Sequence, residues 1–158
     1  MRTKIAIAAL LAALMPAPAL AATTAPLARM GYLVGAWKCT YNAGSVHLPY
    51  DTTYAYDRDG HILRQIASFA GGSGDEELLS YDAQHNVWTA IVLDDQGDAT
   101  VMHAISRDPN HIAYRSVYPD ANVDVRFDRL SASQYTLRGT VRSGGKTTTS
   151  IDTCLRAR

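Results

Sequence analysis

Short runs of alternating hydrophobic and polar residues cover most of the chain after residue 35, and this pattern predicts β-strands. Late in the sequence, Val123, Val125 and Phe127 would share one face of a strand. Asp124 and Arg126 would share the other face, because successive side chains of a strand point to opposite sides. Ten such runs are predicted, at residues 36–41, 49–57, 61–69, 77–82, 87–93, 99–106, 111–118, 122–130, 134–141 and 146–156.

The segments between these runs have the composition of tight turns, with Gly, Asn, Asp or Pro where the backbone must reverse. No helical period interrupts the series, so the strands are expected to form antiparallel hairpins. The turn segments are residues 42–44, 57–60, 94–97, 108–110 and 143–145. A longer segment, residues 71–76, predicts a mobile loop at one mouth of the fold, and Asp75, Glu76 and Glu77 are expected at its solvated edge.

Ten strands in about 120 residues give the spacing of a sandwich or an up-and-down barrel. With an even number of strands, the last can pair antiparallel with the first and leave no exposed edge. The predicted fold class is therefore all-β, a closed antiparallel up-and-down β-barrel of about ten strands with a short N-terminal helix.

The short helix is predicted just before the first strand. Thr23 or Thr24 would cap it, and Pro26 suits its first turn. Its apolar residues, Leu27, Met30 and Val34, recur at helical spacing before Gly35 ends it.

The first 21 residues have the layout of a secretory signal peptide. Arg2 and Lys4 form a positive segment, residues 5–14 an apolar run, and residues 19–21 a small-x-small cleavage site. Cleavage would leave a single domain at residues 22–158 in the periplasm or outside the cell; an uncleaved anchor is the alternative. No later stretch has the ~18 apolar residues of a transmembrane helix.

Composition and charge exclude several classes of protein. The 158 residues are 47% hydrophobic, which argues against disorder, and 15 basic residues balance 15 acidic ones. Without a basic field, the sequence does not indicate nucleic-acid binding. Two cysteines are too few for a disulfide-dense small fold.

The two cysteines test the closure of the barrel. Cys39 lies in the first predicted strand and Cys154 in the last, and exported proteins form disulfides. A bridge here would require a register that places Trp37 opposite Arg156, a favourable cation–π pair. It would also turn Asp152 and Arg156 toward the inner face together with Cys154. Two buried free thiols are the alternative.

Gly35-x-Trp37, after a short helix and at the start of the first strand, resembles the lipocalins and the wider calycin group, including small haem-binding nitrobindin-like barrels. In those barrels a basic residue near the end commonly packs on the tryptophan, and Arg156 is the matching position here. The central Thr-Asp-Tyr motif of lipocalins and the helical lid of fatty-acid-binding proteins are absent. The resemblance implies a barrel and a tendency to bind small apolar ligands.

Haem is disfavoured as a cofactor. The iron ligand of nitrobindin-like proteins is a late histidine, whereas none follows His111 in this sequence. His103, which alternates with Val101 and Ile105, is the one histidine expected to face an apolar side, where a hydrogen-bonded core residue is the commoner outcome. No metal is predicted, since the acidic segments 57–60 and 94–98 are more typical of tight turns than of calcium loops.

No catalytic motif is recognised, so no catalytic residue is proposed and an enzyme is the less favoured class. A ten-stranded barrel should instead enclose a cavity unless large side chains fill it. Tyr54 and Tyr56 would share one face, as would Tyr114 and Tyr118, while Arg115 would reach the interior only past a bulge. The candidate ligand-binding residues are Tyr54, Tyr56, Trp88, Met102, Tyr114, Arg115 and Tyr118.

Three classes of function follow. The first is an exported carrier of a small apolar or amphipathic molecule. The second is an envelope interaction module or inhibitor that acts through loops such as residues 71–77, on a barrel without a ligand cavity. The third is an enzyme with an unrecognised site. The alternative for the candidate ligand-binding residues is that they are ordinary strand aromatics and a surface arginine.

Overall fold

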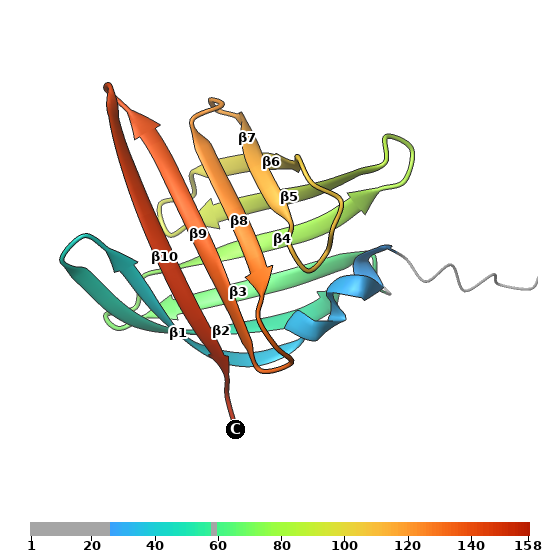
Figure 1. The fold of residues 1–158 in the computed structure, drawn as a ribbon, viewed down its shortest axis with the longest axis horizontal. Helices are drawn as coiled ribbons and strands as arrows, with labels where there is room; N and C mark the ends of the chain where they lie inside the picture. Colours follow the sequence, from blue (N-terminus) through green and yellow to red (C-terminus); the bar gives the residue numbers. More distant parts are fainter. Residues whose placement is uncertain (1–25, 58–59) are drawn as a thin grey trace, which may run out of the picture.

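The computed structural model describes residues 26–57 and 60–158, so the predicted signal peptide and helix cap lie outside the described residues. In this part of the chain, one eight-residue 3₁₀-helix and ten strands form the fold (Figure 1). They are η1 (Pro26–Leu33), β1 (Gly35–Ala43), β2 (Val46–Asp57), β3 (Ile62–Phe69), β4 (Gly74–Asp82), β5 (Val87–Asp94), β6 (Ala99–Ala104), β7 (Ala113–Tyr118), β8 (Val123–Arg129), β9 (Gln134–Ser143) and β10 (Lys146–Arg156).

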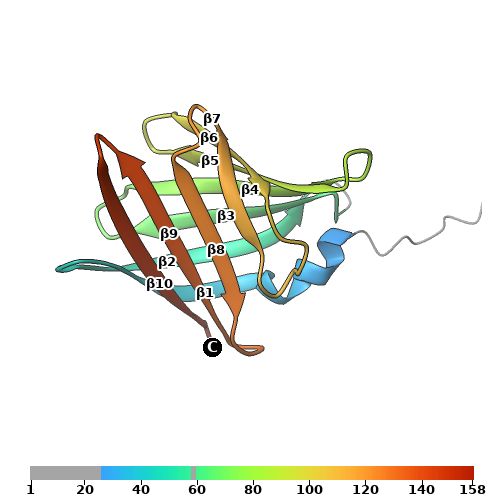
Figure 2. The same cartoon turned by 45° about the horizontal axis from the view of Figure 1, so that its top comes forward.

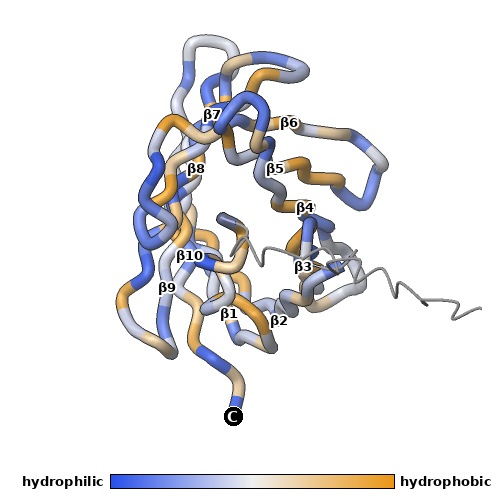
Figure 3. Tube along the Cα trace, turned by 90° about the vertical axis from the view of Figure 1, so that its right-hand side faces the viewer, coloured by the Kyte–Doolittle hydropathy of each residue, from blue (hydrophilic) through white to orange (hydrophobic). Residues whose placement is uncertain are grey.

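The strands form one closed barrel, which confirms the predicted architecture. Each strand pairs antiparallel with the next along the chain, and β10 returns to pair with β1 (Figure 2). Viewed toward η1, the strands form a ring with the helix across its near end (Figure 3). Closure satisfies the backbone groups that an open sheet would leave at its edges.

The disulfide between Cys39 and Cys154 is formed and joins the first strand to the last. The register of β1 and β10 is the predicted one, with Trp37 opposite Arg156. Cys154 and Asp152 are both buried, as expected for residues two apart on the inner face.

The predicted mobile loop at residues 71–76 is wrong, because β4 begins at Gly74 and only a short turn precedes it. Phe69 N donates to Ser73 O at 2.9 Å, and Gly74 and Asp75 are already paired with β3. The expected solvated edge therefore belongs to a strand, and its acidic residues alternate between the two faces of the sheet.

Helix η1 covers one end of the barrel with Leu27, Met30 and Leu33. The buried residues recur every third position because a 3₁₀-helix has three residues per turn. The sequence pattern predicts Val34 as the third buried residue of the helix, whereas the structure buries Leu33, one residue earlier. Gly35 follows at a φ of +118°, and a Cβ there would lie 2.9 Å from Arg156 Nη1, so the position requires glycine.

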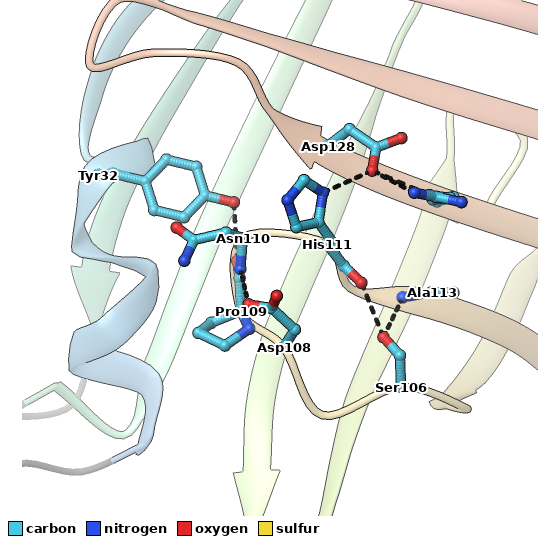
Figure 4. Close-up of polar contacts among 9 residues, drawn as sticks. Tyr32, Ser106, Asp108, Pro109, Asn110, His111, Ala113 and Asp128 are labelled. Carbon is cyan, nitrogen blue, oxygen red and sulfur yellow. Dashed lines mark hydrogen bonds and ion pairs between the residues drawn. The ribbon is translucent and has the colours of Figure 1, made fainter.

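The connection between β6 and β7 completes this closed end (Figure 4). Tyr32 of η1 donates its hydroxyl to Pro109 O at 3.1 Å. Ser106 Oγ donates to His111 O, and His111 Nδ1 lies 2.9 Å from Asp128 Oδ1. These contacts fasten helix, connection and β8 together, so access to the interior is expected from the opposite end.

Within residues 26–57 and 60–158, no helix is long and apolar enough to span a lipid bilayer.

Candidate functional site

A cavity of about 340 Å³ occupies the half of the barrel that lies away from η1. Strand register places it there: Gly35, next to η1, pairs with Tyr54, whereas the cavity residue Tyr50 lies four residues before Tyr54 on β2 and pairs with Cys39, farther from η1. The lining residues are Tyr41, Tyr50, Gln65, Phe69, Asp75, Glu77, Val92, Thr100, Met102, Val123, Val125, Leu137, Gly139, Val141, Ser150 and Asp152.

Buried aromatic side chains fill the barrel between the cavity and η1. Tyr135 lies at their centre, with its ring centroid 4.8 Å from that of Trp37, 6.1 Å from that of Phe127 and 6.3 Å from that of Tyr54. The hydroxyl oxygens of Tyr54 and Tyr135 are 3.3 Å apart. One half of the barrel is therefore a packed core, and the other half is hollow.

Three carboxyl groups line the cavity: Asp75 and Glu77 from β4 and Asp152 from β10. No Lys, Arg or His is among the lining residues, so the charge of this interior is of one sign. Within the described part of the chain, no three His, Cys, Asp or Glu side chains are grouped closely enough to hold a metal ion.

Glu77 is as buried as Asp152, with 6% of each residue exposed. Its neighbour Glu76 points outward and forms an ion pair with Arg64, with Nε and Oε1 2.8 Å apart. Among the described residues, neither a hydrogen bond nor an ion pair reaches the Glu77 carboxyl group. Burial, together with the nearby charge of Asp75, raises the Glu77 pKa to about 8.

Asp152 is also buried, but it has a partner. The Tyr50 hydroxyl donates to Asp152 Oδ2 at 2.6 Å. Burial raises the Asp152 pKa to about 6, although the hydrogen bond from Tyr50 favours the ionised form. The Asp75 pKa is raised by burial and by the charge of Asp94, its partner on β5.

Gln65 and Tyr114 are two further polar side chains in the interior, and of the two only Gln65 has a hydrogen-bond partner. Gln65 Nε2 donates to Thr52 Oγ1 at 3.0 Å, and Thr52 in turn donates to Ile66 O. The Tyr114 hydroxyl is buried without a hydrogen-bond partner. Among the described residues, the Tyr114 hydroxyl is therefore a fully enclosed interior group without a partner, whereas the Glu77 carboxyl group has no protein partner but opens onto the cavity that it lines.

The structure scatters the seven candidate ligand-binding residues. Met102 lines the cavity, while Tyr54, Trp88 and Tyr114 belong to the packed core. Tyr56 is 39% exposed and donates its hydroxyl to Leu27 O.

Arg115 and Tyr118 lie on the outer surface. Arg115 Nε is 2.8 Å from Asp124 Oδ1, and Tyr118 is 58% exposed. The expectation that Tyr118 shares a face with Tyr114 is wrong because of a register shift. Met102 pairs with Ser116 but Val101 pairs with Tyr118, so the extra residue reverses the alternation.

The expected inward position of His103 is also wrong, because its neighbour Met102 takes the interior and His103 is exposed. The residues that sequence analysis missed are Asp75 and Glu77. Their signal in the sequence was partial: they share a strand face with Leu79, but the equally apolar Leu78 lies on the opposite face, so alternation alone does not show which face is buried. The acidic run concealed it, because such runs are usually solvated.

No protein-family model and no curated protein matches this chain. The structure is similar to that of the S-type phycobiliprotein lyase CPES from Guillardia theta, with a TM-score of 0.61 and 11% sequence identity. The match covers 85% of this chain and 93% of that one. At this identity the likeness concerns the fold. Fold and cavity together define a closed ten-stranded antiparallel β-barrel with a partly hollow interior.

Proposed function

We propose that this protein is an exported calycin-like barrel that binds a small, largely apolar ligand in its interior. The observation that carries the proposal is the cavity of about 340 Å³, which lies within the size range of small-molecule sites. The packed aromatic half of the barrel gives this cavity a rigid floor, so the site is formed before any ligand arrives.

The cavity walls support an apolar ligand body. Val92, Met102, Val125 and Leu137 come from four different strands and face the same space. Burial of a ligand against them would remove apolar surface from water, worth about 25 cal/mol per Å². An interaction module on a filled barrel is less well supported, because the hollow half is present.

Binding accounts for the site better than catalysis does. Raised carboxyl pKa values are also typical of general acids and bases. Among the described residues, however, no hydrogen bond links Glu77 to a nucleophilic side chain. The similarity to a lyase is one of fold and transfers no residue or activity to this chain.

The test is saturable binding of the neutral dye N-phenyl-1-naphthylamine, followed by its fluorescence. Val125→Trp would fill the cavity and is expected to weaken binding at least tenfold. Ile66→Trp is the matched control, because Ile66 lies exposed on the outer side of β3. Absence of dye binding, or equal binding by wild type and Val125→Trp, would contradict the proposal.

A further inference from the structure

The cavity has a charge pattern that an apolar ligand alone would not use. Its three ionisable acids, Asp75, Glu77 and Asp152, come from two strands and face one space. On the outer face of the barrel, several acids form ion pairs: Glu76 with Arg64, and Asp124 with Arg115 and Arg142. No Lys, Arg or His is among the residues that line the cavity, so its three acids have no such partner there.

Glu77 is the acid of this cavity that bears most directly on the ligand, because packing of the barrel does not require a carboxyl group at its position. The residue is more than nine-tenths buried, lines the cavity and receives no hydrogen bond from the described residues. An apolar side chain of similar size would fill the same position without an unsatisfied carboxyl group. The missing partner is therefore expected to come from the ligand.

We propose that the ligand is an organic cation, a protonated amine on a small apolar body, whose ammonium group is recognised by Glu77 in a cavity that also holds the carboxyl groups of Asp75 and Asp152. This inference rests on the proposed function and names its ligand class. A bare metal ion is not the occupant indicated, because the three acids are not grouped as metal ligands in the described chain.

The remaining wall suits both parts of such a molecule. An ammonium group has three donors and no acceptor, which matches carboxylates from more than one strand. Tyr50 and Phe69 stack with ring centroids 4.7 Å apart beside Asp152, and aromatic faces attract cations. The aliphatic side chains of Val92, Val125 and Leu137 would contact the apolar body.

Ligand binding is then linked to proton release. The titratable groups that influence Glu77, or are influenced by it, are Asp75, Tyr54, Tyr114 and Tyr135. Asp152, on β10, shares the cavity with it. Glu77 holds its proton up to about pH 8, whereas a bound ammonium favours the carboxylate. Amine binding at pH 7 is therefore expected to release a proton, and amine affinity to rise between pH 6 and pH 9.

The test uses three probes with one body and different head groups: 4-phenylbutylamine, 4-phenylbutanol and 4-phenylbutyrate. Each competes with N-phenyl-1-naphthylamine at pH 8. The amine is expected to bind at least tenfold more tightly than the alcohol, and the carboxylate more weakly than either. Calorimetry in two buffers of different ionisation enthalpy measures the released proton.

Two neighbouring substitutions locate the effect. Glu77→Gln is expected to reduce amine affinity at least tenfold and alcohol affinity less than twofold. Glu76→Gln, on the outer face, should change neither. Equal or tighter binding of the alcohol, or an amine preference that persists in Glu77→Gln, would overturn the inference. Both results would leave dye binding in the cavity, and so the proposed function, intact.

Discussion

The guanidinium carbon of Arg156 lies 4.4 Å from the centre of the Trp37 ring, at the end of the barrel that η1 closes. The same guanidinium donates from Nη1 to Val34 O at 2.9 Å, and Trp37 Nε1 donates to Leu33 O at 2.6 Å. The two residues thus satisfy the carbonyl groups that the end of a helix leaves free.

Arg156→Ala is therefore expected to lower the free energy of unfolding by roughly 2–3 kcal/mol, since it removes a stacked cation and its hydrogen bonds. Arg156→Lys should recover less than half of this, because an ammonium group lacks the planar fork of donors. Urea denaturation measures both. Arg138→Ala, at an exposed site on β9, is the control and should have little effect; equal losses at the two sites would refute the role of Arg156.

Glu77→Gln is expected to stabilise the protein at alkaline pH. The folded-state pKa of about 8 lies above the ordinary glutamate pKa of 4.5, so the folded protein keeps a proton that the unfolded chain releases. This group's contribution is fully favourable below about pH 4.5 and is lost as pH rises toward 8, with a slope of at most ~1.4 kcal/mol per pH unit.

Denaturation between pH 5 and pH 9 tests this behaviour. At pH 8.5 the Glu77→Gln variant should be more stable than wild type by at least ~1 kcal/mol. Glu76→Gln removes only a partly exposed ion pair and should stay within ~1 kcal/mol of wild type at every pH. A wild-type profile with the same slope as the Glu77→Gln profile would show that Glu77 titrates normally.

Tyr50→Phe is expected to raise the Asp152 pKa above its value of about 6, because the lost hydroxyl donates to the carboxylate. Carbon-detected NMR titration of the Asp152 carboxyl group measures the shift. Tyr41→Phe is the matched control in the same cavity, and it should leave the titration unchanged. A lowered Asp152 pKa in Tyr50→Phe would contradict the assigned hydrogen bond.

Loss of the disulfide should cost about 3–5 kcal/mol of unfolding free energy, since the bridge closes a long loop in the unfolded chain. The sequence separation of Cys39 and Cys154 is 115 residues. The measurement compares denaturation of wild type with that of the Cys39→Ala/Cys154→Ala double variant. Reduced wild type should unfold with the same free energy as the double variant. The mass of oxidised wild type should be two hydrogens below that of the reduced protein.

Export is tested by the mass of the protein recovered from an exporting bacterial host. Cleavage after Ala21 predicts a product of 137 residues that starts at Ala22. A variant without residues 2–21 should stay in the cytosol. A full-length product in the membrane fraction would support the uncleaved anchor instead.

Much of the fold could be predicted from the sequence because its determinants are local. Alternation over five to eight residues indicates a strand, and turn residues mark where each strand ends. The two cysteines added one long-range constraint, and it was sufficient to place Trp37 opposite Arg156 and Asp152 inside.

The candidate site depended on the tertiary structure for a physical reason. Alternation says that Glu76 and Glu77 face opposite ways, but only the pairing of β4 with β3 and β5 decides which one is buried. A single bulge likewise turned Tyr118 outward. The sequence by itself determined a closed, disulfide-linked barrel; packing alone decided that half of it is filled by aromatic rings and that the hollow half is acidic.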